Sequence, residues 1–194
     1  MATKKVKESL DPRIDELLIS ATDVDAGCDK AAQWINENYK GKKFIMLGIL
    51  KGCIPFIGKI ITKIKPDMTL DFMTVSSFKG KMEAQSAPKI VMDMSEDVKG
   101  KHVLLVEDVV DTGHTIKLVV EMLMLRGAKS VRLITFVDKP TKRKADVKID
   151  YACYELPDKF LVGFGLDYEG QLRNLPYVGT LKREVYEKPK KNKR

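Results

Sequence analysis

The chain has 194 residues, of which 44% are apolar and 32% are charged, a composition typical of one globular domain with a sizeable core. The sequence holds no apolar run long enough for a membrane-spanning helix, and no apolar leader follows the charged N-terminus, so we expect a cytoplasmic protein. Cys28, Cys53 and Cys153 fit neither a disulfide framework nor a zinc pattern, which favours a reducing compartment.

The net charge of +8 is concentrated at the two ends of the chain. Residues 1–8 carry +2 and residues 182–194 carry +5, which leaves only +1 for residues 9–181. Basic tails of this kind are usually solvated, and tails alone contain no element that reads a nucleic-acid groove. We therefore expect neither a nucleic acid nor a membrane as a partner.

Helical and strand patterns alternate along the chain. A first helix is expected from Asp11, and a second, capped by Thr22 or Asp23, runs to about Tyr39. The expected strands cover residues 43–50, 69–77, 89–94, 102–106, 130–137, 151–155 and 161–166, and two further helices cover residues 55–65 and 115–125. This alternation predicts an α/β fold with a parallel sheet and right-handed crossovers.

The most informative pattern lies at residues 103–115. Four apolar residues lead to Glu107 and Asp108, two valines follow, and the turn at 111–115, Asp-Thr-Gly-His-Thr, opens a helix. Ligands of open α/β sheets bind at the carboxyl ends of strands, and a helix start favours an anion. Carboxylates beside a phosphate site favour a sugar phosphate with Mg²⁺. The alternative is a strand that ends in solvated acids before an ordinary helix cap.

This segment resembles the phosphoribosyl-pyrophosphate signature of the type I phosphoribosyltransferases. Further motifs, in the expected order, make the chain similar to the hypoxanthine-guanine phosphoribosyltransferases over about residues 10–180. These motifs are Leu50-Lys51-Gly52, Ser76-Ser77-Phe78, Lys139 after a strand, the stretch 156–163, Leu166-Asp167-Tyr168 and Arg173. The resemblance implies the type I phosphoribosyltransferase fold: a mostly parallel central sheet flanked by helices, a small hood subdomain and a mobile loop.

The resemblance also implies how the chain is divided. One phosphoribosyltransferase domain would span residues 1–194, with a hood formed by the N-terminal segment and about residues 150–180, and with basic tails at 1–8 and 182–194. The mobile loop would begin at Ser77 and Phe78, although the family commonly has tyrosine in place of Phe78. The Leu50–Lys51 peptide bond is expected to be strained and possibly cis, with a plain turn as the alternative.

Each motif then has an implied role. Asp111 would be the catalytic proton acceptor at the purine N7. Glu107 and Asp108 can accept hydrogen bonds from ribose hydroxyls, directly or through a hydrated metal. The implied phosphoribosyl-binding set is Glu107, Asp108, Asp111, Thr112, Gly113, His114 and Thr115. Lys51, Gly52 and Arg173 would bind pyrophosphate; Lys139, Phe160, Leu161 and Asp167 the purine; and Glu107, Asp108 and Asp167 the Mg²⁺ ion.

The implied activity is purine salvage. The 5-phosphoribosyl group of 5-phospho-α-D-ribose 1-diphosphate would pass to hypoxanthine or guanine, giving a nucleoside monophosphate (IMP or GMP) and pyrophosphate. A homodimer or homotetramer is implied as well. Two alternatives stay open: an enzyme that prefers xanthine, and a non-catalytic nucleic-acid-binding regulator built on the same fold.

Overall fold

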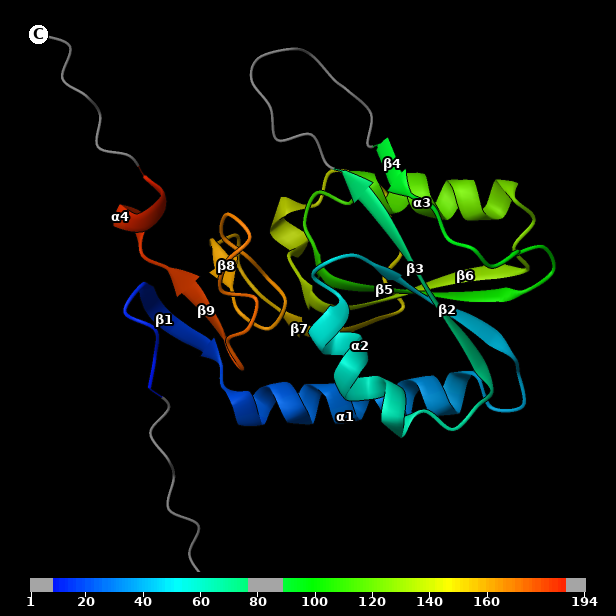
Figure 1. Ribbon diagram of the computed structural model, residues 1–194, viewed down its shortest axis with the longest axis horizontal. Coiled ribbons are helices and arrows are strands. Elements are labelled where there is room, and N and C mark those ends of the chain that lie inside the picture. The colour runs from blue at the N-terminus through cyan, green and yellow to red at the C-terminus, as the bar shows by residue number, and fades with distance from the viewer. Residues whose placement is uncertain (1–8, 77–88, 188–194) are drawn as a thin grey trace, which may run out of the picture.

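The computed structural model describes residues 9–76 and 89–187 (Figure 1). The expected mobile loop at residues 78–88, with Ser77 and Phe78 at its start, lies outside these ranges. Within them, no helix combines the length and the apolar character needed to cross a membrane.

In the described part of the chain, six strands form the central sheet in the order β4-β3-β2-β5-β6-β7. The neighbouring strands are parallel except for β3 and β4. The strands are β2 (Phe44–Ile49), β3 (Met68–Ser76), β4 (Lys89–Met92), β5 (His102–Val110), β6 (Ser130–Asp138) and β7 (Tyr151–Glu155). The predicted fold class, a mostly parallel sheet flanked by helices, is confirmed.

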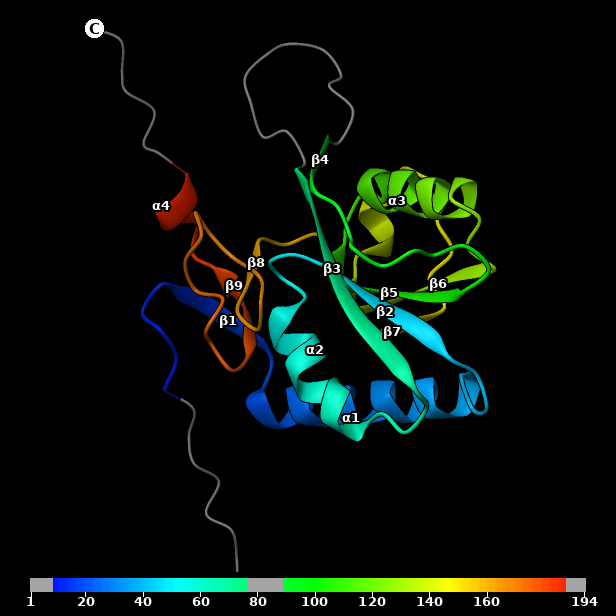
Figure 2. The same ribbon diagram turned by 45° about the vertical axis from the view of Figure 1, so that its right-hand side comes forward.

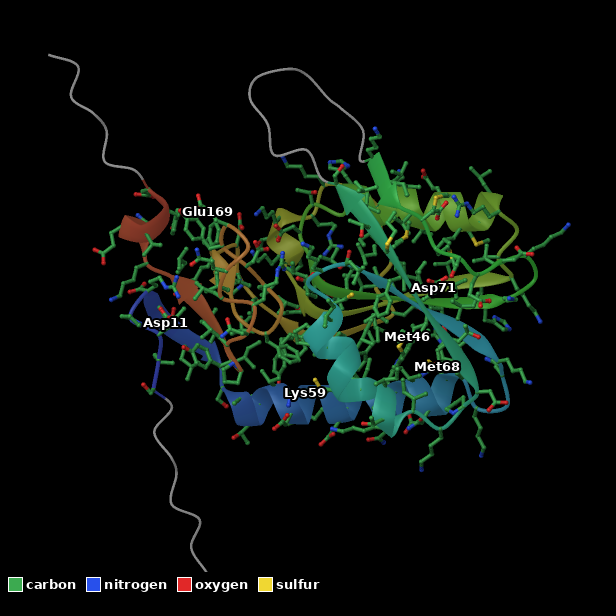
Figure 3. The ribbon with its side chains drawn as sticks, in the orientation of Figure 1. Asp11, Met46, Lys59, Met68, Asp71 and Glu169 are labelled. Atoms are coloured by element: carbon green, nitrogen blue, oxygen red, sulfur yellow. The ribbon has the colours of Figure 1, made fainter. Side chains whose placement is uncertain are left out.

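Helices cover both faces of this sheet (Figures 1 and 2). Helices α1 (Ala21–Asn38) and α2 (Ile54–Ile60), with the 3₁₀ turn η1 (Ile61–Lys63), lie on one face, and α3 (His114–Leu125) lies on the other. The alternation of side chains along β2 explains this arrangement. Met46 packs in the core on the α1 side, as Figure 3 shows, whereas Ile45 and Leu47 pack on the α3 side.

A second, antiparallel sheet lies beyond the carboxyl end of the central sheet. Its order is β1-β9-β8, with β1 (Ile14–Ile19), β8 (Leu161–Val162) and β9 (Val178–Leu181), and α4 (Arg183–Tyr186) follows β9. The division into hood and tails stays a prediction. Strand β7 belongs to the central sheet, although residues from about 150 were expected in the hood. Helix α4 lies inside the segment 182–194 that was expected to be a basic tail.

The helix expected from Asp11 is wrong, because this segment forms strand β1. Ile14 pairs with Leu181 in β9, and the burial of Ile14 suits a strand as well as a helix. The sequence did not predict β9, so nothing revealed the partner of β1. The next helix is capped by Ser20, whose Oγ accepts a hydrogen bond from the Asp23 N–H at 3.1 Å, and not by Thr22 or Asp23.

Among the strands whose lengths differ from their predictions, two shape the site. Strand β5 continues to Val110, so the two adjacent acids lie within the strand and Glu107 pairs with Thr135 of β6. Strand β8 ends at Val162 because the next residues turn away with positive φ, and the φ of Gly163 is 97°.

Candidate active site

The carboxyl end of β5 packs against the loop that follows β2. An ideal Cβ on Gly52 would lie 1.7 Å from Oδ2 of Asp108, and one on Gly165 would lie 2.1 Å from the Gly52 carbonyl oxygen. Both positions therefore require glycine for close approach. The Leu50–Lys51 peptide bond is cis. Residues from three distant parts of the sequence thus form one wall of a cavity.

Glu107 and Asp108 form an acidic pair in which Glu107 is buried and Asp108 is partly buried. Only 7% of Glu107 is exposed, and burial, together with the negative charge of Asp108, raises its pKa well above the ordinary range. Burial also raises the pKa of Asp108, although the Val109 N–H, which donates to its Oδ1 at 2.9 Å, opposes the shift. Neither carboxyl forms a salt bridge with any residue that the structure describes. The pair offers oxygen atoms suited to hydroxyl groups or to a divalent cation.

Asp111 has the opposite surroundings. The Lys139 Nζ lies 3.3 Å from its Oδ1, and the Lys142 Nζ lies 3.1 Å from its Oδ2. Lys139 is only 5% exposed, and its Nζ also donates to the Lys159 carbonyl oxygen at 2.9 Å. Burial lowers the pKa of Lys142, but the hydrogen bonds and charges of Asp111 and Asp158 together outweigh this, and the pKa is raised. Two ammonium groups therefore hold the Asp111 carboxylate.

The turn between β5 and α3 presents N–H groups to the cavity. Gly113 caps α3 with a φ of 83°, and the first N–H groups of a helix have no acceptor within it. The carbonyls of the turn are engaged elsewhere. Arg143 donates to the Asp111 carbonyl at 3.0 Å, and the Ala145 N–H donates to the Thr112 carbonyl at 2.9 Å. Donors rather than acceptors thus face the cavity, as an anion requires.

Two adjoining cavities open at this end of the sheet, and they share Asp108, Val109, Asp111 and Asp167. The first has a volume of about 450 Å³ and is lined by Lys51, Gly52, Glu107, Thr112, Gly113, Thr115 and Arg173, among others. The second has a volume of about 480 Å³ and is lined by Lys139, Lys142, Asp158, Phe160, Leu161 and Tyr186, among others. One cavity is built from polar loop atoms, and the other combines aromatic rings with charges.

Asp167, at the boundary of the two cavities, is held in place by its neighbours. Its Oδ1 pairs with Arg173 at 2.7 Å, and its Oδ2 accepts a hydrogen bond from the Gly170 N–H at 2.7 Å. Arg173 also donates to the Gly165 carbonyl at 2.5 Å. Across the described ranges, no three acidic, histidine or cysteine side chains converge as a ready-made metal site. Asp167 therefore does not join Glu107 and Asp108 in a three-carboxylate cluster.

Most of the site residues expected from the sequence meet around these cavities. Those that line one or both are Lys51, Gly52, Glu107, Asp108, Asp111, Thr112, Gly113, Thr115, Lys139, Phe160, Leu161, Asp167 and Arg173. His114 is exposed and lines neither. Sequence reasoning missed Lys142 and Arg143, although the cluster of basic residues just after Lys139 was the available signal.

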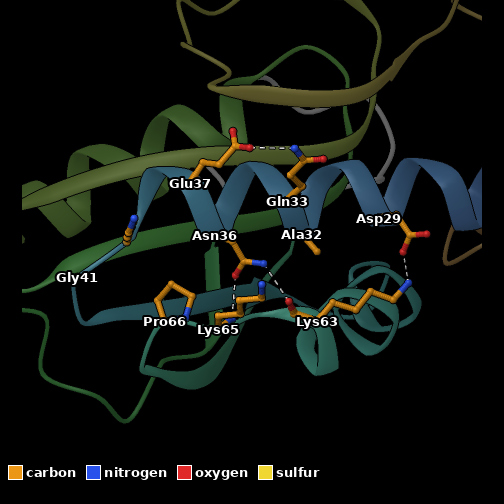
Figure 4. A pocket seen from close by; sticks show the side chains of 10 residues that line it. Asp29, Ala32, Gln33, Asn36, Glu37, Gly41, Lys63, Lys65 and Pro66 are labelled. Carbon is orange, nitrogen blue, oxygen red and sulfur yellow. Dashed lines mark hydrogen bonds and ion pairs between the residues drawn. The ribbon is translucent and has the colours of Figure 1, made fainter.

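A larger cavity elsewhere shows why volume alone is a poor guide. A groove of about 710 Å³ lies between α1 and residues 63–66 (Figure 4). Several of its polar side chains already have partners: Asp29 pairs with Lys63, Gln33 with Glu37, and Asn36 with backbone atoms of Lys63 and Lys65. With these groups already engaged, the groove offers no convergent set of free polar atoms to a ligand.

The fold and the turn between β5 and α3 agree with the protein family whose model the sequence matches. Residues 20–169 match the family model described as phosphoribosyl transferase domain. The chain belongs to the phosphoribosyltransferase family.

Named relatives make the family assignment more specific. The chain is 54% identical to a hypoxanthine-guanine phosphoribosyltransferase of Mycoplasma pneumoniae and 50% identical to one of Mycoplasma genitalium. Each match covers 86% of this chain and 95% of the relative. A crystal structure of a hypoxanthine phosphoribosyltransferase from Staphylococcus aureus superposes with a TM-score of 0.86 at 39% identity, covering 91% of this chain and 96% of that chain.

Proposed function

We propose that the protein salvages purines by transferring the phosphoribosyl group of 5-phospho-α-D-ribose 1-diphosphate to hypoxanthine or guanine. The observation that carries the proposal is the pair of adjoining cavities that share Asp108, Asp111 and Asp167. One cavity suits phosphates and ribose hydroxyls, and the other suits a planar base. The bond to be formed joins these two parts of the product, so its place is the shared boundary. The names of the relatives support the same reaction.

The turn at residues 111–115, between β5 and α3, is called the phosphate turn below. It would bind the 5′-phosphate through its N–H groups and the hydroxyls of Thr112 and Thr115. Glu107 and Asp108 would accept hydrogen bonds from the ribose hydroxyls. Gly52 and Arg173, on the opposite wall, would bind pyrophosphate together with Lys51. Arg143 would stabilise the conformation of this turn, because its guanidinium donates hydrogen bonds to the carbonyl oxygens of Val110 and Asp111.

The base would lie between Phe160 and the Lys139–Asp111 pair. Lys139 has a donor for the purine O6, and Asp111 would accept a proton at N7 as the base becomes bonded to ribose. Held by Lys139 and Lys142, the Asp111 carboxylate is fixed beside the cavity in which this proton is to be transferred. Leu161 would pack beside the base, which explains an apolar lining next to charged groups.

Enzymes of this family generally depend on a metal, and we propose Mg²⁺. The carboxyls of Glu107 and Asp108 provide hard oxygen ligands, and Asp167 lies at the boundary of the two cavities. Mg²⁺ usually takes one or two carboxylates and completes its shell with water and substrate phosphates, which fits the absence of a three-carboxylate cluster in the described ranges. When bound, the ion would neutralise negative charge on the leaving pyrophosphate.

We propose a homodimer or homotetramer that works in the cytoplasm. Cys28, Cys53 and Cys153 are all free thiols, which supports a reducing compartment.

The test is a direct assay. The full-length protein is incubated with 5-phospho-α-D-ribose 1-diphosphate, Mg²⁺ and, in separate reactions, hypoxanthine, guanine, xanthine or adenine, and the release of pyrophosphate and nucleoside monophosphate is measured. We expect fast conversion of hypoxanthine and guanine and slow conversion of adenine. Faster conversion of xanthine would replace the proposal with the xanthine-preferring alternative. No conversion of any base, combined with retention on nucleic acid, would favour the regulator.

A further inference from the structure

The C-terminal helix α4 brings an aromatic ring to the base cavity from a part of the sequence that carries no predicted site residue. Tyr186 stacks on Phe160 with ring centroids 4.9 Å apart and ring planes 21° apart. Both rings line the cavity that also contains Lys139 and Asp111. At this separation the rings are in direct stacking contact, so no third ring fits between them.

Phe160 depends on such neighbours for its orientation. It is 37% exposed, and an exposed phenyl ring at a cavity mouth has few contacts to fix its rotamer. Tyr168 meets Phe160 edge to face, with centroids 5.7 Å apart and planes at 76°. Tyr186 covers one face of the ring, so a base can stack only on the opposite face.

Tyr168 also connects the two parts of this aromatic group. Its hydroxyl donates to the Val185 carbonyl at 3.1 Å, next to Tyr186 in the chain. The same side chain thus contacts Phe160 with its ring and anchors α4 with its hydroxyl. By contrast, the hydroxyl of Tyr186 has no hydrogen-bond partner among the described residues. The ring of Tyr186, and not its hydroxyl, is therefore what acts on Phe160.

We propose that Tyr186 is a positioning residue for the purine: it covers one face of Phe160 and holds the ring ready to stack on the base with the other. This inference deepens the proposed function and rests on it. A ring fixed before binding loses less side-chain freedom when the base arrives, so the affinity for the base rises. The phosphate cavity does not include Tyr186, so binding of 5-phospho-α-D-ribose 1-diphosphate is independent of it.

The experiment is a steady-state comparison of the full-length wild type with Tyr186→Ala, Tyr186→Phe and Tyr168→Phe. For Tyr186→Ala we expect KM for hypoxanthine and guanine to rise roughly 3- to 10-fold, the weight of one aromatic pair. The kcat and the KM for 5-phospho-α-D-ribose 1-diphosphate should stay at wild-type values. Tyr186→Phe keeps the ring and should match the wild type. Tyr168→Phe loses the anchor of α4 and should raise the base KM about 2-fold.

The outcomes separate this inference from the proposed function. A wild type that converts no purine overturns the proposed function itself. An active wild type with an unchanged base KM in Tyr186→Ala overturns only the role of Tyr186, and so does a lower base KM, which would mean that Tyr186 obstructs the base. Equal losses in both substrate KM values would indicate a merely structural residue and would also overturn it. If Tyr186→Ala does not fold, Tyr186→Leu, which keeps apolar cover without a ring, carries the same prediction.

Discussion

Two acidic centres at the end of β5 lie only three residues apart and have opposite surroundings. Glu107 is buried and Asp108 is partly buried, neither has a cationic partner in a salt bridge among the described residues, and burial raises the pKa of both. Asp111 is paired with Lys139 and Lys142. Acidic side chains that lie close in sequence thus acquire different chemistry from the elements that pack against them. The first centre suits hydroxyls and a cation, and the second suits an acceptor fixed in one place.

The largest expected effect comes from Asp111→Asn, which keeps the shape of the side chain but removes the proton acceptor. We expect kcat to fall by roughly 10²-fold or more, the usual weight of general acid–base catalysis. Steady-state turnover with hypoxanthine measures it. Glu121→Gln is the matched control, because Glu121 is an exposed acid on α3 that lines neither cavity of the site. An unchanged kcat in Asp111→Asn would remove this residue from the chemistry.

The second-largest effect is expected from substitutions of Glu107 and Asp108, the other acidic centre. Asp108→Asn and Glu107→Gln should each raise the KM for 5-phospho-α-D-ribose 1-diphosphate about 10-fold, the weight of one charge-assisted hydrogen bond. The KM for hypoxanthine should change little in Glu107→Gln, because Glu107 does not line the base cavity, and less than the KM for 5-phospho-α-D-ribose 1-diphosphate in Asp108→Asn, because Asp108 lies where the two cavities meet. Initial rates at varied concentrations of each substrate provide the measurement. If the base KM rose most, the assignment of the two cavities would have to be reversed.

A smaller effect is expected from Lys142→Ala. The side chain of Lys142 is partly exposed, and a partly exposed ion pair contributes up to about 1 kcal/mol. Removal of one of the two ammonium groups at Asp111 should therefore lower kcat by no more than about 5-fold. Lys144→Ala is the control, since Lys144 is exposed and forms no ion pair with Asp111. Equal losses in the two variants would mean that the pairing with Asp111 does not matter.

The smallest effect is on stability, and its sign differs between the centres. In metal-free buffer, Glu107→Gln replaces a buried carboxyl by a neutral group of the same shape and should raise Tm by about 2 °C. Asp111→Asn removes the carboxylate that pairs with Lys139 and leaves Lys142 with Asp158 alone, so it should lower Tm by a similar amount. Thermal unfolding followed by circular dichroism measures both. Shifts of the same sign would show that the surroundings of the two centres do not differ as described.

Short-range patterns predicted much of this molecule, and long-range contacts account for what they missed. The apolar runs of β2, β5 and β6 and the turn at Gly113 were readable because strands, turns and helix starts are local features. Strand β1 was mistaken for a helix because its partner β9 follows more than 150 residues later.

The candidate active site shows the same contrast between local patterns and long-range contacts. The acids and the phosphate turn lie within one short segment, so the sequence revealed them together. Lys142 and Tyr186 were not recognised, because their roles depend on contacts that only the fold creates: Lys142 with Asp111, and Tyr186 with Phe160. His114 belongs to the recognised segment, yet the start of α3 leaves it exposed.

The most direct test of the difference between the two centres is a calorimetric titration of 5-phospho-α-D-ribose 1-diphosphate, with Mg²⁺, into Asp111→Asn and Asp108→Asn side by side. If Asp111 acts in proton transfer, its variant should bind within about 3-fold of the wild-type Kd. If Asp108 binds the ribose or its metal, its variant should bind about 10-fold more weakly or worse. Equal losses in the two variants, or a greater loss in Asp111→Asn, would contradict the division of labour between the two acidic centres.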